Sequence, residues 1–521
     1  MVLTAEKTLL VASCAPASNA EALEARAFLA GLPPSAAVEL RLDAMTEEPA
    51  FGALREGFAG RKLIATVRSA AEGGAFRGNE EDEKRLLGAA LAAGFDLIDV
   101  EYRGGARPTL PDFPPSKQIL SFHDTEGIPA DLAGLAARML ATPAAYVKVV
   151  ALANDSRDAL RLIELQAANP GGRLAAFGMG EAGIATRVVG PYLGSALAYG
   201  ALVPGQTTAP GQLLAQDLVE IYGVGRARFV SRAFFLLGGV VSHSLSPAIH
   251  NANFEALGQD ALYVPLAMRM LGREFEPLVA AFDALGLPAI AASVTIPFKE
   301  EAALLPAAAE YGEKSVNTLL RASSPGEPLR LRVENTDRDA FEAVIEDAFG
   351  EKWKTEGKGG AGVALVLGAG GTARVAVSVL RKMGWVVFIS NRTEARGEAL
   401  AKELGARALS LKPGAPLLEP RIIVNATALG LHAGDAFPCE RGLIRPGVLV
   451  VDAPYRAGGT DLVKASHAAG ARVVDGQTLL LLQAARQAKL YTGVATTPQQ
   501  LVSHLSPRLR SLFASFEEFS P

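Results

Sequence analysis

The sequence predicts an α/β protein in which an N-terminal (β/α)8 barrel, or TIM barrel, precedes a two-lobed α/β unit. Three observations support this prediction. From Leu9 to about Gly223, short apolar strands alternate with helices rich in Ala, Leu, Glu and Arg. A short linker, Tyr222–Arg226, is followed by a new apolar strand at Ala233–Gly238. Further on, another apolar strand at Val363–Leu367 leads into a glycine-rich turn.

The composition sets the class of protein. A chain of 521 residues is too long for one hydrophobic core, so we expect two to four domains. The hydrophobic share of 49%, the charged share of 20% and the net charge of -4 indicate a soluble globular protein with no nucleic-acid or anionic-membrane partner. No apolar run approaches the ~20 residues that cross a bilayer. The two cysteines, Cys14 and Cys439, fall in different predicted domains, which fits a reducing cytoplasm.

Eight strand-then-helix units within little more than two hundred residues are typical of a (β/α)8 barrel. In that fold the chemistry takes place at the carboxyl ends of the strands. The candidate strands, in chain order, are Leu9–Cys14, Ala37–Asp43, Lys62–Arg68, Phe95–Tyr102, Gln118–His123, Ala144–Ala151, Leu174–Met179 and Ala196–Leu202.

The sixth candidate strand, Ala144–Ala151, is apolar except for Lys148 near its middle. An ammonium group is almost never buried without a partner. In aliphatic surroundings its pKa falls from a reference of about 10.4, and the neutral amine can then form a Schiff base with a ketone. We expect such aliphatic surroundings for Lys148. The alternative is a lysine on an edge strand whose amine reaches water.

Charged residues gather at the ends of the predicted barrel strands. In Val38–Asp43 the period of two places Glu39, Arg41 and Asp43 on one face, which must point inward because helices cover the outer face. An ion pair between Glu39 and Arg41 is the structural alternative. Further polar residues lie at or beyond the ends of later strands: Arg68, Glu72, His123, Arg187, Thr208 and Gln212. His123 as a helix cap and Arg187 on a solvated helix face remain alternatives for those two.

Five segments carry a specific resemblance. They are Val38-Glu39-Leu40-Arg41-Leu42-Asp43, Thr66-Val67-Arg68 with Glu72-Gly73-Gly74, Ser121-Phe122-His123-Asp124, Val147-Lys148-Val149 and Ala209-Pro210-Gly211-Gln212. In this order they resemble type I 3-dehydroquinate dehydratase. The resemblance implies that Lys148 forms an imine with 3-dehydroquinate, that His123 is the general acid/base, and that Glu72 orients His123. It also implies that the substrate is bound by Glu39, Arg41, Arg68, Arg187, Thr208 and Gln212.

The second half begins with polar motifs that have structural explanations when each is taken alone. Ser246 and Pro247 suit the N-cap and the first turn of a helix, although the serine hydroxyls and backbone N–H groups of this segment could also face a carboxylate. Lys299 follows the strand-like run Ser293–Phe298 and could be a solvated helix start. Asp337, at the end of Glu334-Asn335-Thr336-Asp337, could be a helix cap.

A glycine turn then indicates a dinucleotide site. After the polar stretch Thr355–Gly362, the strand Val363–Leu367 runs into Gly368-Ala369-Gly370-Gly371, and a helical pattern follows. A strand, a glycine turn and a helix in this order favour a Rossmann lobe, in which the backbone approaches a pyrophosphate. The next strand ends in Asn391-Arg392-Thr393, where an arginine favours the 2′-phosphate of NADP over NAD. A surface role for Arg392 is the alternative.

With the later motifs Asn425-Ala426-Thr427, Val451–Tyr455 and Asp475–Gln483, the region from about residue 231 resembles shikimate dehydrogenase. The resemblance implies that Lys299 and Asp337 are the catalytic pair. It implies substrate binding by Ser244, Ser246, Thr295, Asn317, Asp337, Tyr455 and Gln483. It implies NADP binding by Gly368, Ala369, Gly370, Gly371, Asn391, Arg392, Thr393, Ala453 and Gly476, and no metal.

Together the two resemblances predict a bifunctional shikimate-pathway enzyme that acts on 3-dehydroquinate, 3-dehydroshikimate and shikimate. The expected domains are a barrel in 1–223, a substrate lobe in 231–340 with the helices of 477–521 packing back on it, and an NADP-binding lobe in 341–476. Two alternatives stay open: a second half that prefers quinate, and a metabolite-sensing regulator without turnover. The sequence does not determine the oligomeric state.

Overall fold

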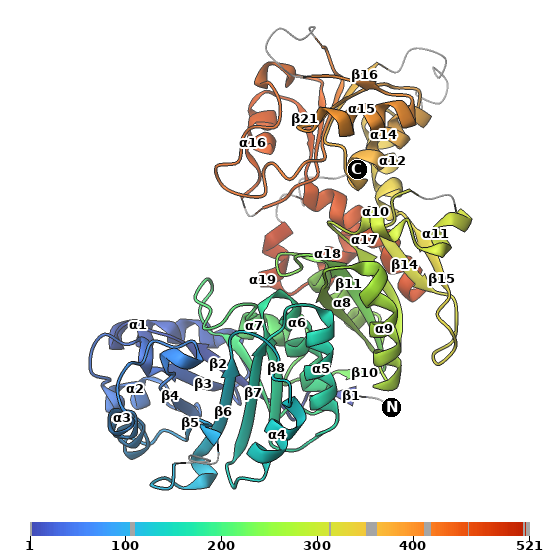
Figure 1. Cartoon of the computed structure of the whole chain (residues 1–521). Helices are drawn as coiled ribbons and strands as arrows, with labels where there is room; N and C mark the ends of the chain where they lie inside the picture. Colours follow the sequence, from blue (N-terminus) through green and yellow to red (C-terminus); the bar gives the residue numbers. More distant parts are fainter. Residues whose placement is uncertain are drawn as a thin grey trace. The chain divides into compact units, whose positions relative to one another are not determined.

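The computed structural model describes residues 3–104, 110–311, 314–350, 362–410, 418–456, 458–513 and 516 (Figure 1). All but the last residue of the polar stretch Thr355–Gly362 therefore lies outside the described residues. The chain divides into two compact units. The first comprises Met1–Pro247, Gly258–Ile290 and Pro325–Glu327, and the second comprises Ala248–Leu257, Ala291–Ser324 and Pro328–Pro521.

The first unit contains the predicted barrel. Its eight strands are all parallel, in the order β8-β7-β6-β5-β4-β3-β2-β9. At the amino ends of β8 and β9, the Ala196 N–H donates to the Leu174 carbonyl (2.8 Å). The strands are β2 (Leu9–Cys14), β3 (Ala37–Arg41), β4 (Leu63–Thr66), β5 (Leu97–Glu101), β6 (Gln118–Asp124), β7 (Tyr146–Leu152), β8 (Leu174–Met179) and β9 (Leu197–Ala201). The predicted (β/α)8 fold is confirmed.

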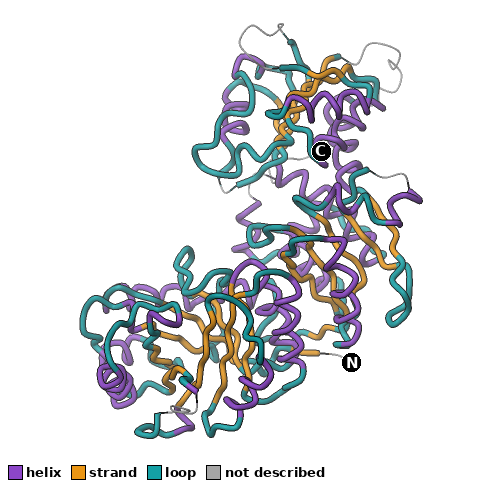
Figure 2. Tube along the Cα trace, viewed as in Figure 1, coloured by secondary structure: helices purple, strands orange, loops and turns teal. Residues whose placement is uncertain are grey.

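Helices flank the barrel strands, as Figure 2 shows in purple around orange. They are α1 (Asn19–Glu24), α2 (Phe51–Gly57), α3 (Glu80–Ala92), α4 (Leu132–Leu140), α5 (Ser156–Ala167), α6 (Gly180–Val189) and α7 (Ala215–Glu220). Side-chain caps fix several starts: Asp155 accepts from the N–H groups of Arg157 and Asp158 at the start of α5. Apolar residues such as Val11, Ile64 and Ile119 fill the centre beneath the polar strand ends.

The ends of six barrel strands differ from the prediction by one or two residues, and β3 shows a physical reason. β3 ends at Arg41 rather than Asp43, because Leu42–Ala44 form a short 3-10 helix, η2. There the Asp43 carboxylate accepts from the Arg41 guanidinium and from the N–H groups of Arg68 and Ala75. Asp43 therefore holds the loops beyond β3 and β4 together instead of continuing the inward face of the strand.

Further strands and helices of the first unit lie outside the barrel. β1 (Leu3–Thr4) pairs antiparallel with β10 (Phe229–Val230), and β11 (Arg232–Gly238) pairs in parallel with β12 (Ala261–Ala267). In α9 (Leu271–Ala284), the buried Glu274 accepts from the N–H and the hydroxyl of Ser156 (3.1 and 2.5 Å) at the start of α5. Its other oxygen accepts from the N–H groups of Arg269 and Met270 (2.9 and 2.7 Å). This one carboxylate ties β12 and α9 to the barrel.

The second unit begins with β13 (Ala289–Val294), β14 (Thr318–Arg321) and β15 (Leu331–Glu334), which pair antiparallel. The helices of this region are α8 (Ser246–Ala256), α10 (Lys299–Ala302), α11 (Pro306–Tyr311) and α12 (Thr336–Phe349). α17 (Gly476–Thr492) packs against α12. Gln487 of α17 bonds Ser293 and Thr318, at the ends of β13 and β14.

A six-stranded parallel sheet forms the rest of the second unit, in the order β18-β17-β16-β19-β20-β21. Counted from β16, this is the strand order 3-2-1-4-5-6 of a Rossmann fold, so the predicted Rossmann lobe is confirmed. Its strands are β16 (Val363–Leu367), β17 (Val386–Ser390), β18 (Arg407–Ala408), β19 (Ile422–Asn425), β20 (Leu449–Asp452) and β21 (Arg472–Val474). The remaining helices are α14 (Gly371–Lys382), α15 (Glu394–Leu404), α16 (Asp461–Ala468), α18 (Pro498–His504) and α19 (Pro507–Arg510). None of the helices in the described ranges has the length and apolar character that a membrane span requires.

Candidate active sites

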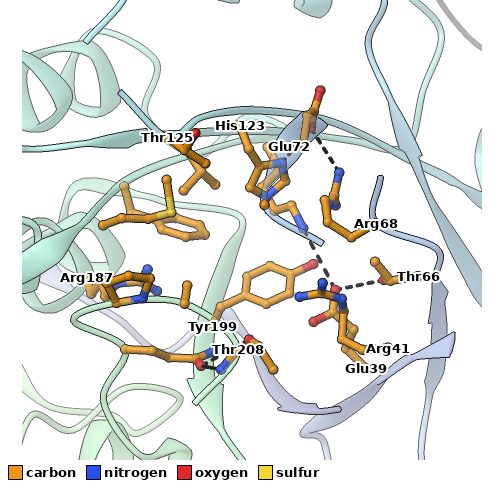
Figure 3. Close-up of a pocket in the computed structure, with 18 residues that line it drawn as sticks. Glu39, Arg41, Thr66, Arg68, Glu72, His123, Thr125, Arg187, Tyr199 and Thr208 are labelled. Atoms are coloured by element: carbon orange, nitrogen blue, oxygen red, sulfur yellow. Dashed lines mark hydrogen bonds and ion pairs between the residues drawn. The ribbon is translucent and has the colours of Figure 1, made fainter. Parts of the chain in front are cut away.

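A cavity opens at the carboxyl ends of the barrel strands (Figure 3). All nine residues that the sequence placed in the barrel site line it: Glu39, Arg41, Arg68, Glu72, His123, Lys148, Arg187, Thr208 and Gln212. Its other lining residues include Thr66, Thr125, Phe177, Met179 and Tyr199. The cavity lies where a (β/α)8 barrel places its chemistry.

Lys148 lies on β7 and is only 4% exposed. Its Nζ is 2.6 Å from Oδ2 of Asp99, 3.8 Å from Oε1 of Glu39 and 4.5 Å from the centre of the Tyr199 ring. The expectation of aliphatic surroundings is therefore wrong. Two carboxylates that point inward from β5 and β3 meet the amine, because successive inward positions on neighbouring strands face the same space.

Glu39 is held in place by hydroxyl groups. Ser13 Oγ donates to its Oε2, and Thr66 Oγ1 donates to its Oε1 (2.8 Å). Arg41 instead forms a two-pronged ion pair with Asp43 at 2.8 Å, which leaves the alternative Glu39–Arg41 pair unformed. The carboxylate of Glu39 thus remains directed toward Lys148.

Arg68 is buried among acids. Its guanidinium lies 2.6 Å from Asp99, 3.0 Å from Glu72 and 3.2 Å from Glu101, and it also donates to Ser121 Oγ. Burial lowers the pKa of this guanidinium, but the three carboxylates outweigh burial and raise the pKa above its ordinary value. Arg68 therefore organises the acidic wall of the cavity.

His123, at the end of β6, forms a pair with Glu72. The imidazole Nδ1 lies 2.9 Å from Glu72 Oε2. Burial, together with the nearby Arg68 and Lys148 cations, lowers the pKa of His123 well below 6.5, so the ring is neutral at pH 7. Burial, with support from Glu101 and Asp99 and against the pull of Arg68, raises the pKa of Glu72 to about 8. A neutral imidazole beside a carboxyl group of this kind can exchange protons with a bound molecule.

Arg187 of α6 has a different environment. It is 5% exposed, so the solvated-helix alternative is wrong. Its Nε donates to the Gly178 carbonyl (3.0 Å), and its guanidinium stacks on the Phe177 ring at 4.7 Å. Among the described residues, no acidic side chain pairs with it, and burial lowers its pKa to about 10. The cavity thus presents one buried cation that an anionic ligand could neutralise.

Thr208 and Gln212 lie in the loop beyond β9. Gln212 Oε1 accepts from the N–H and the hydroxyl of Thr208 (2.7 and 3.0 Å). Thr208 Oγ1 also lies 3.2 Å from Ser13 Oγ. These contacts connect the loop to the wall that holds Glu39.

In the second unit, four predicted residues come together around one carboxylate. Lys299 Nζ, in the first residue of α10, lies 2.5 Å from Oδ2 of Asp337 in the first turn of α12. Asn317 donates from Nδ2 to Asp337 Oδ1 (3.0 Å) and to Gln483 Oε1 of α17 (3.0 Å). Asp337 is therefore neither a simple helix cap nor a surface acid, since Asn335 provides the cap.

The glycine turn after β16 adjoins this pair. A Cβ atom on Gly371 would lie 3.1 Å from Lys299 Cβ and 3.0 Å from Ser315 Oγ. Gly371 begins α14, and Gly368 has a φ of +111°, a conformation that favours glycine. Gly476 packs as closely at the start of α17, where a Cβ would lie 2.3 Å from the Ala453 carbonyl oxygen. The turn and the Lys299–Asp337 pair thus share one region of the second unit.

The remaining predicted residues lie in loops or at the start of a helix. Ser244 and Ser246 belong to the first unit, and Ser244 Oγ accepts from the N–H of Ser246 (3.2 Å), the first residue of α8. Thr295 and Tyr455 are half-buried after β13 and β20. In the loop after β17, Asn391 donates to the Thr393 carbonyl, and Arg392 is exposed.

Three residues of the barrel site are absent from the sequence prediction: Asp99, Glu101 and Tyr199. The first two lie in Leu97-Ile98-Asp99-Val100-Glu101, where charged residues alternate with apolar ones as they do around Glu39. That alternation is a usable signal for inward-pointing acids. Tyr199 carries no comparable signal, because a tyrosine in a buried strand is an ordinary core residue.

Comparisons with known proteins agree with this division. Residues 14–227 match the family model of type I 3-dehydroquinase, and residues 236–318 match that of the shikimate dehydrogenase substrate binding domain. A chloroplastic bifunctional 3-dehydroquinate dehydratase/shikimate dehydrogenase from Arabidopsis thaliana is 30% identical over 460 residues, which cover 84% of this chain and 74% of that protein. Shikimate dehydrogenase (NADP(+)) from Rubrobacter xylanophilus is 38% identical over 270 residues, 50% of this chain and 90% of that one.

Among solved structures, shikimate 5-dehydrogenase from Thermus thermophilus in complex with NADP(H) and shikimate is 32% identical and covers 54% of this chain and 99% of its own, with a TM-score of 0.41. The fold and the two sites define a class of enzyme that joins a TIM-barrel site with a buried lysine to a dinucleotide-binding oxidoreductase unit. The chain belongs to the family of bifunctional 3-dehydroquinate dehydratase/shikimate dehydrogenases.

Proposed function

We propose that this chain catalyses two consecutive reactions. The barrel removes water from 3-dehydroquinate to give 3-dehydroshikimate, and the second unit reduces 3-dehydroshikimate to shikimate with NADPH. One observation carries the proposal. A single cavity holds the buried Lys148, the His123–Glu72 pair, and Arg187, which has no acidic partner among the described residues. An amine, a proton carrier and a carboxylate acceptor are what the dehydration of a β-hydroxy keto acid requires.

In the barrel, Lys148 forms a Schiff base with the ketone of 3-dehydroquinate. A protonated imine draws electrons more strongly than a ketone, so the proton on the neighbouring carbon becomes easier to remove. His123 takes that proton and supplies one to the departing hydroxyl, a role worth about 10²–10⁴-fold in rate. Glu72 orients the imidazole through the 2.9 Å contact with Nδ1.

Arg187 binds the substrate carboxylate in this proposal. A guanidinium offers two parallel N–H donors that match a carboxylate, and the buried, stacked position of Arg187 keeps water from competing. The other predicted contacts, to ring hydroxyls, come from Glu39, Arg41, Arg68, Thr208 and Gln212, all of which line the same cavity.

In the second unit, Lys299 and Asp337 work on the ring carbonyl and its neighbouring hydroxyl. When bound, NADPH supplies the hydride for the reduction. Lys299 provides the proton that the carbonyl oxygen takes up, and Asp337 holds the lysine at 2.5 Å. Asn317, which also donates to Gln483, fixes the other side of Asp337. The proposed substrate contacts are completed by Ser244, Ser246, Thr295 and Tyr455.

The residues of the glycine turn fit NADP. A Cβ on Gly370 would meet nothing within 4 Å, so the turn leaves space beside the start of α14. The free N–H groups at a helix start attract phosphate. In the proposal Gly368, Ala369, Gly370 and Gly371 lie along the pyrophosphate, Asn391, Arg392 and Thr393 hold the 2′-phosphate, and Ala453 and Gly476 complete the cofactor site.

The proposal extends to organisation and location. We retain the domains 1–223, 231–340 with the helices of 477–521, and 341–476. A cytoplasmic location is supported by the two cysteines, Cys14 and Cys439, which are free thiols. The proposed partners are the three small-molecule substrates and NADP, without nucleic acid or membrane.

A coupled assay tests both reactions on the whole chain. Given 3-dehydroquinate and NADPH, the protein should produce shikimate. Lys148→Ala should abolish dehydration while reduction of added 3-dehydroshikimate continues, and Lys299→Ala should do the reverse. Loss of both activities from either change, with an unchanged melting temperature, would contradict two independent sites.

Substrate choice in the second unit has its own measurement. We expect a higher kcat/KM for the oxidation of shikimate than of quinate, because the proposed contacts are those of a shikimate site. A preference for quinate would overturn that part of the proposal. A folded protein that turns over neither substrate would instead support the regulator that the sequence left open.

A further inference from the structure

Tyr199 places a hydroxyl group in the barrel cavity that makes no hydrogen bond with any of the described residues. The residue lies on β9 and is 6% exposed, and its Oη is buried. A buried hydroxyl without a partner destabilises a folded protein, so most such groups are paired. A hydroxyl that stays unpaired in a ligand-sized cavity has room for a partner from a bound molecule.

A bound molecule that contacts the Tyr199 hydroxyl would lie near Lys148. The centre of the tyrosine ring is 4.5 Å from Lys148 Nζ, and the ring packs against Phe177 at 5.8 Å between centres. In Figure 3 the hydroxyl points away from Arg187 and toward the side of the cavity that holds Arg68. The hydroxyl thus lies on the Arg68 side of the cavity, away from Arg187 and the proposed carboxylate site, and the Lys148 amine lies over its ring.

The hydroxyl of Tyr199 is a donor at working pH. Burial, reinforced by the negative charges of Glu39 and Asp99, raises its pKa well above 10, so the phenol stays neutral. The other hydroxyl groups of this wall are already committed. Ser13 and Thr66 donate to Glu39, and Ser121 donates to Asp99. Among these four hydroxyl groups, that of Tyr199 is therefore the one whose proton remains available to a bound molecule.

We propose that Tyr199 is a further catalytic residue of the barrel site, and that its hydroxyl donates a hydrogen bond to the ketone oxygen of the carbon that Lys148 attacks. This inference rests on the proposed function. When Nζ bonds to that carbon, the π pair of the carbonyl moves to the oxygen, and a donor placed there stabilises the charge that develops. The same contact persists while the oxygen leaves.

The proton balance needs no net change at Tyr199. The lysine nitrogen, paired with Asp99, brings three hydrogens into the reaction. As the C–O bond breaks and the C=N bond forms, two of them end on the oxygen, which departs as water, and the third stays on the nitrogen of the protonated imine. The cavity relays these protons, and the tyrosine keeps its own. A phenol held neutral by burial suits this role, because it donates a hydrogen bond without being consumed.

Tyr199→Phe tests the inference, because it keeps the ring and its contact with Lys148 and removes only Oη. The probe is 3-dehydroquinate mixed with the whole chain, quenched with borohydride at short times, and the mass of the peptide that contains Lys148 is measured. We expect adduct formation to slow by about 10- to 100-fold, as loss of an oxyanion donor does elsewhere. Tyr146→Phe, outside the cavity lining, serves as the matched control.

Two further readouts separate catalysis from structure. Shikimate lacks the ketone, so its affinity for the barrel, measured as inhibition of the dehydratase reaction without NADPH, should not change in Tyr199→Phe. The melting temperature should stay the same or rise, because an unpaired buried hydroxyl is lost. An unchanged rate of adduct formation, or an equal loss of shikimate affinity, would overturn the inference. If the parent protein itself forms no adduct, the Schiff-base proposal fails first and takes the inference with it.

Discussion

Asp99 Oδ2 lies 2.6 Å from Lys148 Nζ, and Asp99 Oδ1 lies 2.6 Å from the Arg68 guanidinium. One buried carboxylate thus bridges the two cations of the cavity wall. The contact between Asp99 and Lys148 is a short ion pair between two buried side chains. Burial raises the pKa of Asp99, but the nearby cations Arg68 and Lys148 lower the pKa by more than burial raises it. The pKa of Asp99 therefore lies below its ordinary value. Asp99 therefore stays charged and holds the lysine in place.

Removal of this charge should disable the barrel site. In Asp99→Asn, Lys148 keeps only the more distant Glu39, and a buried cation that loses its partner costs about 3–5 kcal/mol. We expect a lower melting temperature and at least a tenfold loss of dehydratase kcat/KM. Glu101→Gln is the matched control, since it also takes a carboxylate from Arg68 but none from Lys148. Equal loss of activity in the two variants would show that Asp99 acts only through Arg68.

Replacement of Arg187 should separate binding from stability. The fall of its pKa from 12.5 to about 10 corresponds to roughly 3 kcal/mol of unfavourable burial. Arg187→Met should therefore leave the melting temperature unchanged or raise it. The KM for 3-dehydroquinate should rise by about 10- to 100-fold, the loss expected for charge-assisted hydrogen bonds to a carboxylate. Arg157→Met, at an exposed arginine paired with Asp155, should alter neither quantity. An unchanged KM for Arg187→Met would show that another residue binds the substrate carboxylate.

Glu72 should make stability depend on pH in a defined direction. Its pKa rises from 4.5 to about 8 in the folded protein, so the folded state holds this proton more tightly than the unfolded state. The resulting stabilisation is complete below pH 4.5 and disappears as the pH rises through 8. Melting temperatures of the parent and of Glu72→Gln, measured between pH 5 and pH 9, should therefore converge or cross as the pH rises. A constant difference would mean that Glu72 is ionised throughout.

Two glycines of the proposed cofactor site should respond differently to a single added methyl group. At Gly370 an added Cβ meets nothing within 4 Å, so Gly370→Ala should fold normally and lose NADPH affinity by tenfold or more. At Gly476 the added Cβ would lie 2.3 Å from one backbone oxygen and 2.7 Å from another, so Gly476→Ala should lower the melting temperature of the second unit. Dehydratase activity should survive in both. An unchanged NADPH affinity in Gly370→Ala would show that the pyrophosphate does not bind at the glycine turn.

Arg392 should determine the choice of cofactor. It is exposed after β17, where the 2′-phosphate of NADP would lie. Arg392→Ala should raise the KM for NADPH by about tenfold or more and leave that for NADH unchanged, because only NADPH has the phosphate. Arg396→Ala, also exposed and four residues further on, is the control. A parallel rise in both constants would indicate a general defect of the loop.

The strands of the barrel could be predicted closely because each is a short apolar run between helices. β2 and β8 have the predicted ends, and β3 departs by two residues, where Asp43 bonds N–H groups that follow another strand. The polar residues of the cavity could be predicted because alternation along a strand shows which side chains point inward.

The partners of those residues could not be predicted in the same way. Alternation along β5 places Asp99 inside the barrel, but only the pairing of β5, β6 and β7 brings it to Lys148, nearly fifty residues later. Aliphatic surroundings were therefore the wrong inference from an apolar strand. In the second unit, Lys299 and Asp337 are separated by 38 residues, and their pairing likewise depends on the fold.

Glu274 has a consequence for any attempt to dissect the chain. Its carboxylate accepts two hydrogen bonds from Ser156 in the barrel and two from the N–H groups that precede α9. If the chain were cut near Tyr222–Arg226 and the two fragments were separated, Glu274 would remain in one fragment and the start of α5, which it contacts, in the other. The two halves of the chain are thus joined by side-chain contacts as well as by the linker. In an isolated dehydrogenase half, the carboxylate of Glu274 would lose its contacts with Ser156 and become exposed to solvent.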